Sequence, residues 1–172
     1  MSWILRTAIV ASLVVTACGD LNVDDTSGST TGPPPGTTTN NGTVSANVNG
    51  EQFLGRLSTG ATYIDGRFSF SAYDGYNRQF EVSVRVHGPG TFESGTPNSP
   101  TVSLIEGTGP DARRWFLPSL TGAGSFTLTF LSENAAVGHF SVHLFPDSAT
   151  VLAGVTARRN VTAGAFNVNM SR

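Results

Sequence analysis

From residue 43 onward, apolar and polar residues alternate with a period of two, the spacing of side chains on opposite faces of a β-strand. The longest run covers residues 80–87, where Phe and Val alternate with Glu, Ser, Arg and His. Asn49-Gly50, Asp65-Gly66 and Asp74-Gly75 separate several runs, and such pairs favour tight turns. No apolar stripe with helical spacing interrupts the pattern. It predicts an all-β fold, either an antiparallel β-sandwich or a partly closed barrel, with about eight to ten short strands.

Phenylalanine supplies much of the predicted core. Seven Phe side chains are expected to face inward: Phe68, Phe70, Phe80, Phe126, Phe130, Phe140 and Phe166. Burial of each stabilises the fold by about 1.5–3 kcal/mol, so the core needs no disulfide. A Gly-x-Phe pattern recurs at residues 66–70, 124–128, 138–142 and 164–168. We interpret its glycine as a turn or bulge residue at the entry to a strand.

The first 17 residues have the pattern of a secretory signal peptide. One positive charge, Arg6, precedes an uncharged apolar run at residues 7–15. That run is too short for a membrane-spanning helix, which needs about 20 residues. Two small residues then precede Cys18, the only cysteine in the chain. An ordinary signal peptide that happens to contain a cysteine is the alternative interpretation.

Val15-Thr16-Ala17-Cys18 resembles the lipobox of bacterial lipoprotein precursors. The resemblance implies that the Cys18 thiol takes a diacylglycerol, that the signal is cut before it, and that the new N-terminus is acylated. Several acyl chains would hold the protein at a membrane, because one chain alone binds only marginally. Gly19, rather than an aspartate, follows the cysteine, which implies the outer membrane of the cell envelope.

Residues 18–42 are predicted to be the lipidated cysteine and a disordered linker. The segment is rich in Gly, Thr and Pro, and apart from Leu21 and Val23 it has almost nothing to bury. A coil of this length has an end-to-end distance of about 25–30 Å. Residues 43–172 then form a single domain, a size that can bury its own core.

The charge of that domain argues against nucleic acid as a partner. The chain has ten basic residues, all arginine, and twelve acidic residues. Arg6 and three aspartates precede residue 43, which leaves nine charges of each sign in the domain. A neutral domain with scattered arginines lacks the basic surface that nucleic-acid binding requires.

The two ends of the domain carry a second resemblance. The opening run at residues 44–53, with its Ala-x-Val-Asn-Gly core, and the closing Gly-x-Phe-x-Val strands at 138–142 and 164–168 are similar to a family of uncharacterised bacterial lipoproteins. The resemblance covers both ends of the domain but not its middle. It implies a β-sandwich and assigns no function.

No catalytic, metal or cofactor site can be assembled from the sequence. His139 and His143 share a strand face but lie about 13 Å apart, too far to chelate one zinc ion. The acidic residues lack calcium-loop spacing, no serine lies in a Gly-x-Ser-x-Gly elbow, and no cysteine follows Cys18. We therefore expect no enzymatic activity and no cofactor.

Two aromatic positions remain as candidates for binding. Tyr73 and Tyr76 flank one turn, and Arg113 and Arg114 precede Trp115 in the irregular middle of the domain. Exposed aromatic side chains on loops are typical of glycan and protein recognition. The alternative is that Trp115 plugs one end of the fold and the tyrosines cover the other.

Together these features predict a lipid-anchored envelope lipoprotein that acts as a non-catalytic binding or interaction module for a glycan or a protein. Two alternatives stay open. One is a structural spacer without a ligand, and the other is a hydrolase whose site is formed only by the fold.

Overall fold

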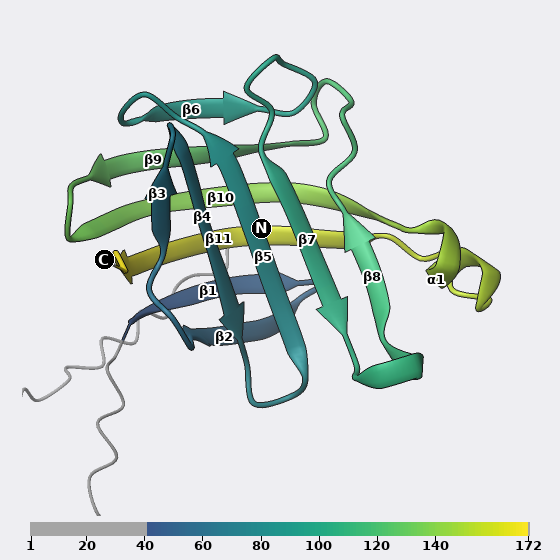
Figure 1. The fold of residues 1–172 in the computed structure, drawn as a ribbon. Coiled ribbons are helices and arrows are strands. Elements are labelled where there is room, and N and C mark those ends of the chain that lie inside the picture. Colours follow the sequence, from purple (N-terminus) through teal and green to yellow (C-terminus); the bar gives the residue numbers. More distant parts are fainter. Residues whose placement is uncertain (1–40, 172) are drawn as a thin grey trace, which may run out of the picture. The chain divides into compact units, whose positions relative to one another are not determined.

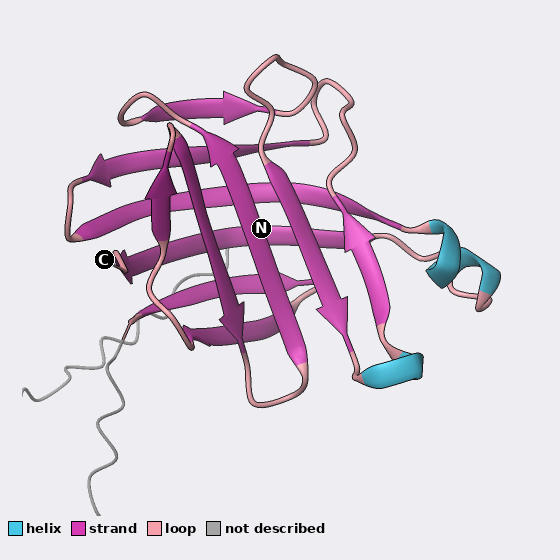
Figure 2. Cartoon of the chain, in the orientation of Figure 1, coloured by secondary structure: helices cyan, strands magenta, loops and turns pink. Residues whose placement is uncertain are grey.

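The structure, a computed structural model, describes residues 41–171. The predicted signal peptide, Cys18 and nearly all of the predicted linker lie outside the described residues. Strands make up most of the described chain, with one 3-10 turn and one short helix (Figure 2). The elements are β1 (Gly42–Val48), β2 (Glu51–Leu57), β3 (Thr62–Ile64), β4 (Arg67–Tyr73), β5 (Arg78–Arg85), β6 (Gly90–Glu93), β7 (Thr101–Glu106), η1 (Gly109–Asp111), β8 (Arg113–Phe116), β9 (Gly124–Leu131), β10 (Ala135–Pro146), α1 (Ser148–Leu152) and β11 (Arg159–Asn169).

Eight strands close into an antiparallel barrel in the order β11-β1-β2-β4-β5-β7-β8-β10, with β10 pairing back to β11. Strands β9 and β6 extend the sheet beyond β10, and β3 pairs with β4. In Figure 1, β4, β5 and β7 cross in front of β1, β2 and β9–β11 at a steep angle. The all-β, antiparallel prediction is confirmed, and of its two alternatives the structure has the barrel rather than the sandwich. Two short ladders, β2–β4 and β8–β10, join the faces and close the sheet.

Buried phenylalanine rings link the two faces of the barrel. Phe166 on β11 stacks on Phe126 with centroids 5.0 Å apart, and it contacts Phe70 on the opposite face at 5.3 Å. Phe80 bridges the faces in the same way, 4.7 Å from Phe53 and 5.7 Å from Phe140. Six of the seven predicted core phenylalanines are buried. Such ring pairs stabilise a core beyond the burial of their area.

Phe130 is the exception, because it is 50% exposed. The β9–β10 ladder pairs Leu128 with Gly138 and Phe130 with Val137, so it skips Thr129. This extra residue shifts the alternation by one position and turns Phe130 to the outer face. The prediction that Phe130 faces inward is therefore wrong.

Two of the three predicted turns have the expected backbone. Asn49-Gly50 and Asp65-Gly66 have positive φ at both residues, as a two-residue hairpin of this type requires. The turn at Asp74 differs, since its positive φ falls on Asn77. There the Asp74 carboxylate accepts hydrogen bonds from the backbone N–H groups of Tyr76 and Arg78, each at 2.9 Å.

The predicted role of the Gly-x-Phe glycines holds at two strand entries, since Gly66 lies in a turn and Gly124 begins β9. Gly138 and Gly164 are instead buried inside strands, beside the register shifts of the β9–β10 and β10–β11 ladders. Gly138 pairs with Phe166 and Gly164 pairs with Phe140, so each glycine faces the phenylalanine of the other strand. A Cβ on Gly164 would lie 2.6 Å from the Phe140 carbonyl oxygen and 2.7 Å from its ring. The glycines make room for rings to lie across the neighbouring strand.

The barrel has two open ends, which differ in the loops that form them. The entry end, beside the first described residues, is formed by residues 58–61, 65–66, 86–89, 132–134 and 170–171. The far end is formed by residues 49–50, 74–77, 107–112 and 147–158. At the entry end, Asn169 N–H donates to the Asn41 carbonyl at 2.9 Å. At the far end, Gly107 N–H donates to the Asn77 carbonyl at 3.0 Å.

The reciprocal glycine–phenylalanine packing predicts that Gly164→Ala destabilises the protein strongly. The added methyl overlaps backbone and ring atoms of Phe140, so the free energy of unfolding should fall by about 2–3 kcal/mol or more. Gly75→Ala is the matched control, because nothing lies within 4 Å of its Cβ position. It should change stability by less than about 0.5 kcal/mol. Equal denaturant midpoints for the two variants would contradict the packing argument.

Candidate functional site

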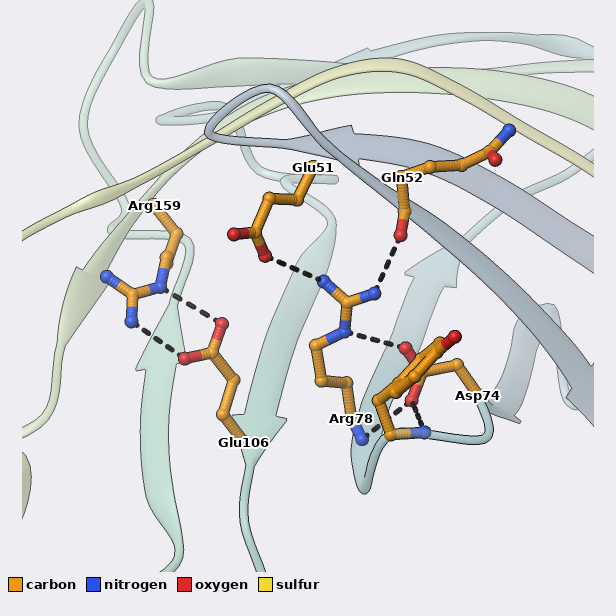
Figure 3. A network of polar contacts seen from close by, with 7 residues as sticks. Glu51, Gln52, Asp74, Arg78, Glu106 and Arg159 are labelled. Carbon is orange, nitrogen blue, oxygen red and sulfur yellow. Dashed lines mark hydrogen bonds and ion pairs between the residues drawn. The ribbon is translucent and has the colours of Figure 1, made fainter.

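A pocket of about 390 Å³ opens at the far end of the barrel. It gathers two arginines and two glutamates from four different elements, and some of these side chains are drawn in Figure 3. Its lining residues are Val48, Asn49, Glu51, Tyr76, Arg78, Glu106 and Arg159. A second hollow of about 400 Å³ shares Glu51, Tyr76 and Arg78 and adds Gln52. Closure of the barrel places these groups together, because they lie far apart along the chain.

Arg78, the first residue of β5, is held on every side of its guanidinium. Its Nε donates to Asp74 Oδ2 at 2.6 Å, and its Nη2 donates to the Gln52 carbonyl at 2.7 Å. Glu51 completes the set at 3.7 Å (Figure 3). The guanidinium also lies 5.6 Å from the ring centroid of Phe53 in the core. These contacts fix the position of the cation, because a planar guanidinium can bond at its edges while its face lies on a ring.

Arg159, the first residue of β11, repeats this arrangement. Its Nε and Nη2 donate to the two carboxylate oxygens of Glu106 at 3.0 and 2.7 Å. Its guanidinium lies 4.1 Å from the ring centroid of Trp115. The Trp115 indole N–H in turn donates to the Ala157 carbonyl at 2.8 Å. A bidentate pair of this kind combines charge with directional bonding, so it holds both strands in register at the rim.

The pocket thus has a fixed floor and an open wall. Arg78 and Arg159 are mostly covered, with side-chain exposures of 13% and 19%. By contrast, the Glu51 side chain is 84% exposed and Tyr76 is 81% exposed. A ligand that entered would meet the Tyr76 ring, the Glu51 carboxylate and the outer edges of the two ion pairs.

Charged side chains that pair with one another dominate the lining of this pocket. It contains no His, Ser or Cys, so it offers none of the usual pairs of nucleophile and base. Each of its carboxylates faces an arginine. Within residues 41–171, no three His, Cys, Asp or Glu side chains gather as a metal site. His139 and His143 both lie exposed on the outer face of β10.

Of the five residues predicted for binding, one lines the pocket. Tyr76 does so, while Tyr73 is 47% exposed at the β2–β4 corner and pairs with Arg56. The Trp115 side chain is 1% exposed and lies beneath Arg159, so its ring is not available at the surface.

The two neighbouring arginines also lie outside the pocket. Arg113 donates to the carbonyls of Pro110 and Ala112. Arg114 is exposed on the outer face, 3.6 Å from the Glu81 carboxylate. The predicted residues therefore do not form one surface.

Helix α1 is fastened to β8 close to these residues. The Asp147 carboxylate caps the helix by accepting a hydrogen bond from Thr150 N–H at 2.7 Å. This hydrogen bonding by Thr150, with a smaller contribution from Arg114, lowers the pKa of Asp147 below its ordinary value. The buried Thr150 hydroxyl accepts from Arg114 N–H and donates to the Arg114 carbonyl. The connection between β10 and β11, which includes Ala157 and the approach to Arg159, is thereby held in place.

The chain matches no protein-family model, no curated protein and no solved structure. Neither helical segment within residues 41–171 has the length and apolar character needed to cross a membrane. Function is therefore inferred from the geometry and from the sequence pattern.

The Arg159–Glu106 pair gives a testable prediction about the rigidity of the pocket. Glu106→Gln should lower the free energy of unfolding by about 1–2 kcal/mol, because a partly covered guanidinium loses its charged acceptor. Glu133→Gln, at an exposed position of the opposite end, should change it by less than about 0.5 kcal/mol. Chemical denaturation of Glu106→Gln, of Arg159→Gln and of the double variant measures the coupling energy of the pair. A coupling energy of zero would mean that the pair does not stabilise the fold.

Proposed function

We propose that this protein is a lipid-anchored, non-catalytic binding module of the bacterial cell envelope, and that its far-end pocket binds a glycan. The lipobox-like Val15-Thr16-Ala17-Cys18 supports the anchor. The exposed Tyr76 ring beside a fixed polar pocket supports the binding site, and this is the observation that carries the proposal.

The lining of the pocket matches the chemistry of a sugar. One face of a pyranose ring is rich in C–H groups and stacks on a flat aromatic side chain, while its hydroxyls need planar donors and acceptors at the edge. Tyr76 supplies the ring, Glu51 an accepting carboxylate, and Arg78 a donating guanidinium. Because Arg78 is already bonded to Asp74 and Gln52, little conformational entropy is lost when a ligand arrives.

The direction of the chain suits this arrangement. Asn41 lies at the entry end, beside Asn169, while the pocket lies at the opposite end. A protein held at Cys18 through residues 19–40 would have its entry end toward the lipid. The pocket would then face the surrounding medium, where a glycan is accessible.

The anchor is tested by Cys18→Ala. Loss of the thiol removes the only group that can form the thioether, so the variant should incorporate no radiolabelled palmitate and should leave the membrane fraction. The parent protein, labelled in parallel, should carry palmitate and sediment with membranes. Equal incorporation by the two proteins would overturn the anchor.

The binding site is tested by Tyr76→Ala on an oligosaccharide array. The truncation should weaken glycan retention at least about tenfold, since a stacked aromatic anchor is lost. The melting temperature should shift by no more than a few degrees, because the ring is exposed. Tyr73→Ala is the matched control, with a tyrosine of similar type that lies outside the pocket, and it should retain the glycan.

Three results would contradict the proposal. Failure of the parent protein to retain any glycan would favour a spacer without a ligand. Equal loss of retention in Tyr73→Ala and Tyr76→Ala would place the binding site outside the pocket. If the parent binds a protein ligand and Tyr76→Ala no longer does, the pocket is the binding site but its ligand is a protein and not a glycan.

A further inference from the structure

The entry end of the barrel holds a larger and less polar pocket than the far end. Its volume is about 540 Å³. Tyr63, Pro89, Leu131 and Met170 supply the apolar part of its lining, and His87 and Glu133 are among its polar members. The ion pairs of residues 41–171 lie at the far end or on the outer face of the sheet, and none crosses this opening. The two ends of one barrel thus differ in chemical character.

Exposed apolar side chains lie next in the chain to residues that line this pocket. Tyr63, which lines it, is 43% exposed, and Ile64 beside it at the end of β3 is 66% exposed. Phe130, which is 50% exposed, precedes the lining residue Leu131 on β9. Phe130 faces outward only because the ladder skips Thr129. A β-bulge that places a phenylalanine in solvent loses burial that a regular strand would have provided. We name Tyr63, Ile64, Phe130 and Leu131 the apolar rim.

The point where the chain enters the domain lies beside the apolar rim. The Asn41 carbonyl accepts from Asn169 N–H, and the Asn169 carbonyl accepts from Ala61 N–H at 2.8 Å. Met170 N–H then donates to the Asn134 carbonyl, in the turn that follows Leu131. Residues 41, 61, 134 and 170 therefore form one hydrogen-bonded group at this end.

The length of chain before residue 41 limits how far this end can be from an anchor at Cys18. Residues 19–40 separate the two, and a chain of 22 residues reaches at most about 75 Å when fully extended. Such a tether gives the entry end a high effective concentration at the surface that holds Cys18, so even a weak contact would be populated.

We propose that the entry end is seated on the lipid bilayer, with the apolar rim at the boundary between headgroups and acyl chains. The proposal rests on the lipid anchor of the proposed function and adds a second, reversible contact to it. Tyrosine suits this depth because its ring is apolar and its hydroxyl is polar. Arg67 and Arg85, exposed beside Ile64, face anionic headgroups, and the nearby Asp65 carboxylate opposes them in part.

Fluorescence quenching by lipid tests this seating on the full, acylated protein. Phe130→Trp places a reporter on the apolar rim, and Phe116→Trp places a matched reporter at another exposed phenylalanine, on β8, away from the entry end. Both variants keep a large aromatic residue at an exposed position, so both should fold. In vesicles of phosphatidylethanolamine and phosphatidylglycerol with brominated acyl chains, we expect about twofold quenching of the Phe130→Trp reporter and almost none of the Phe116→Trp reporter. The buried Trp115 contributes the same background to both.

A charged rim provides the second test. Ile64→Glu in the Phe130→Trp protein should restore its emission while palmitate incorporation stays unchanged, because a carboxylate does not enter the apolar layer. Equal quenching of the two reporters, or none in an acylated protein, would overturn the seating and leave the anchor intact. A protein without palmitate that fails to bind vesicles would overturn the anchor instead. Shielding of Phe130→Trp in whole envelopes but not in pure lipid would assign the rim to a protein and overturn the bilayer as its occupant.

Discussion

The reciprocal packing of Gly138 with Phe166 and of Gly164 with Phe140 is the constraint on which the barrel depends. Strands β10 and β11 pair along a long antiparallel ladder of the barrel, and both carry large rings that turn into its interior. A side chain at either glycine would push the strands apart, so the close approach exists only because the Cβ is missing. The freed space lets Phe166 reach Phe70 across the core, which ties the two faces together.

The same need to cover aromatic rings shapes the far end. Phe53 and Trp115 lie close beneath the surface there, and arginines rather than aliphatic side chains cover them. A guanidinium can do this because its faces are weakly hydrated while its edges bond to carboxylates. The cover of the core and the floor of the pocket are therefore the same two residues, Arg78 and Arg159. Any ligand that binds there meets a surface whose position is set by the stability of the barrel.

The two ends of the barrel therefore differ in the chemistry that they present to a partner. The far end presents fixed charges of both signs beside an exposed Tyr76, whereas the entry end presents an apolar rim and a pocket that no ion pair of the described residues crosses. A chain that enters beside the apolar end and carries a lipid at Cys18 would place each end in the medium it matches. Anchoring, orientation and binding would then follow from one axis of the fold.

Much of the strand content was set locally. Alternation in residues 80–87 and 140–144 determined the strand type and the buried face, and Asn49-Gly50 determined its own turn, because each depends only on neighbouring residues. The choice between sandwich and barrel was not local, since it depends on ladders of two residue pairs at each corner.

Phe130 turned outward because one unpaired residue in β9 shifted the alternation of inward and outward side chains, which the sequence pattern alone does not reveal. Trp115 and Tyr76 looked alike in sequence, and only tertiary packing buried one and exposed the other. Arg159 and Glu106, 53 residues apart, could be paired only by closure of the barrel, because no local pattern links side chains that meet across strands.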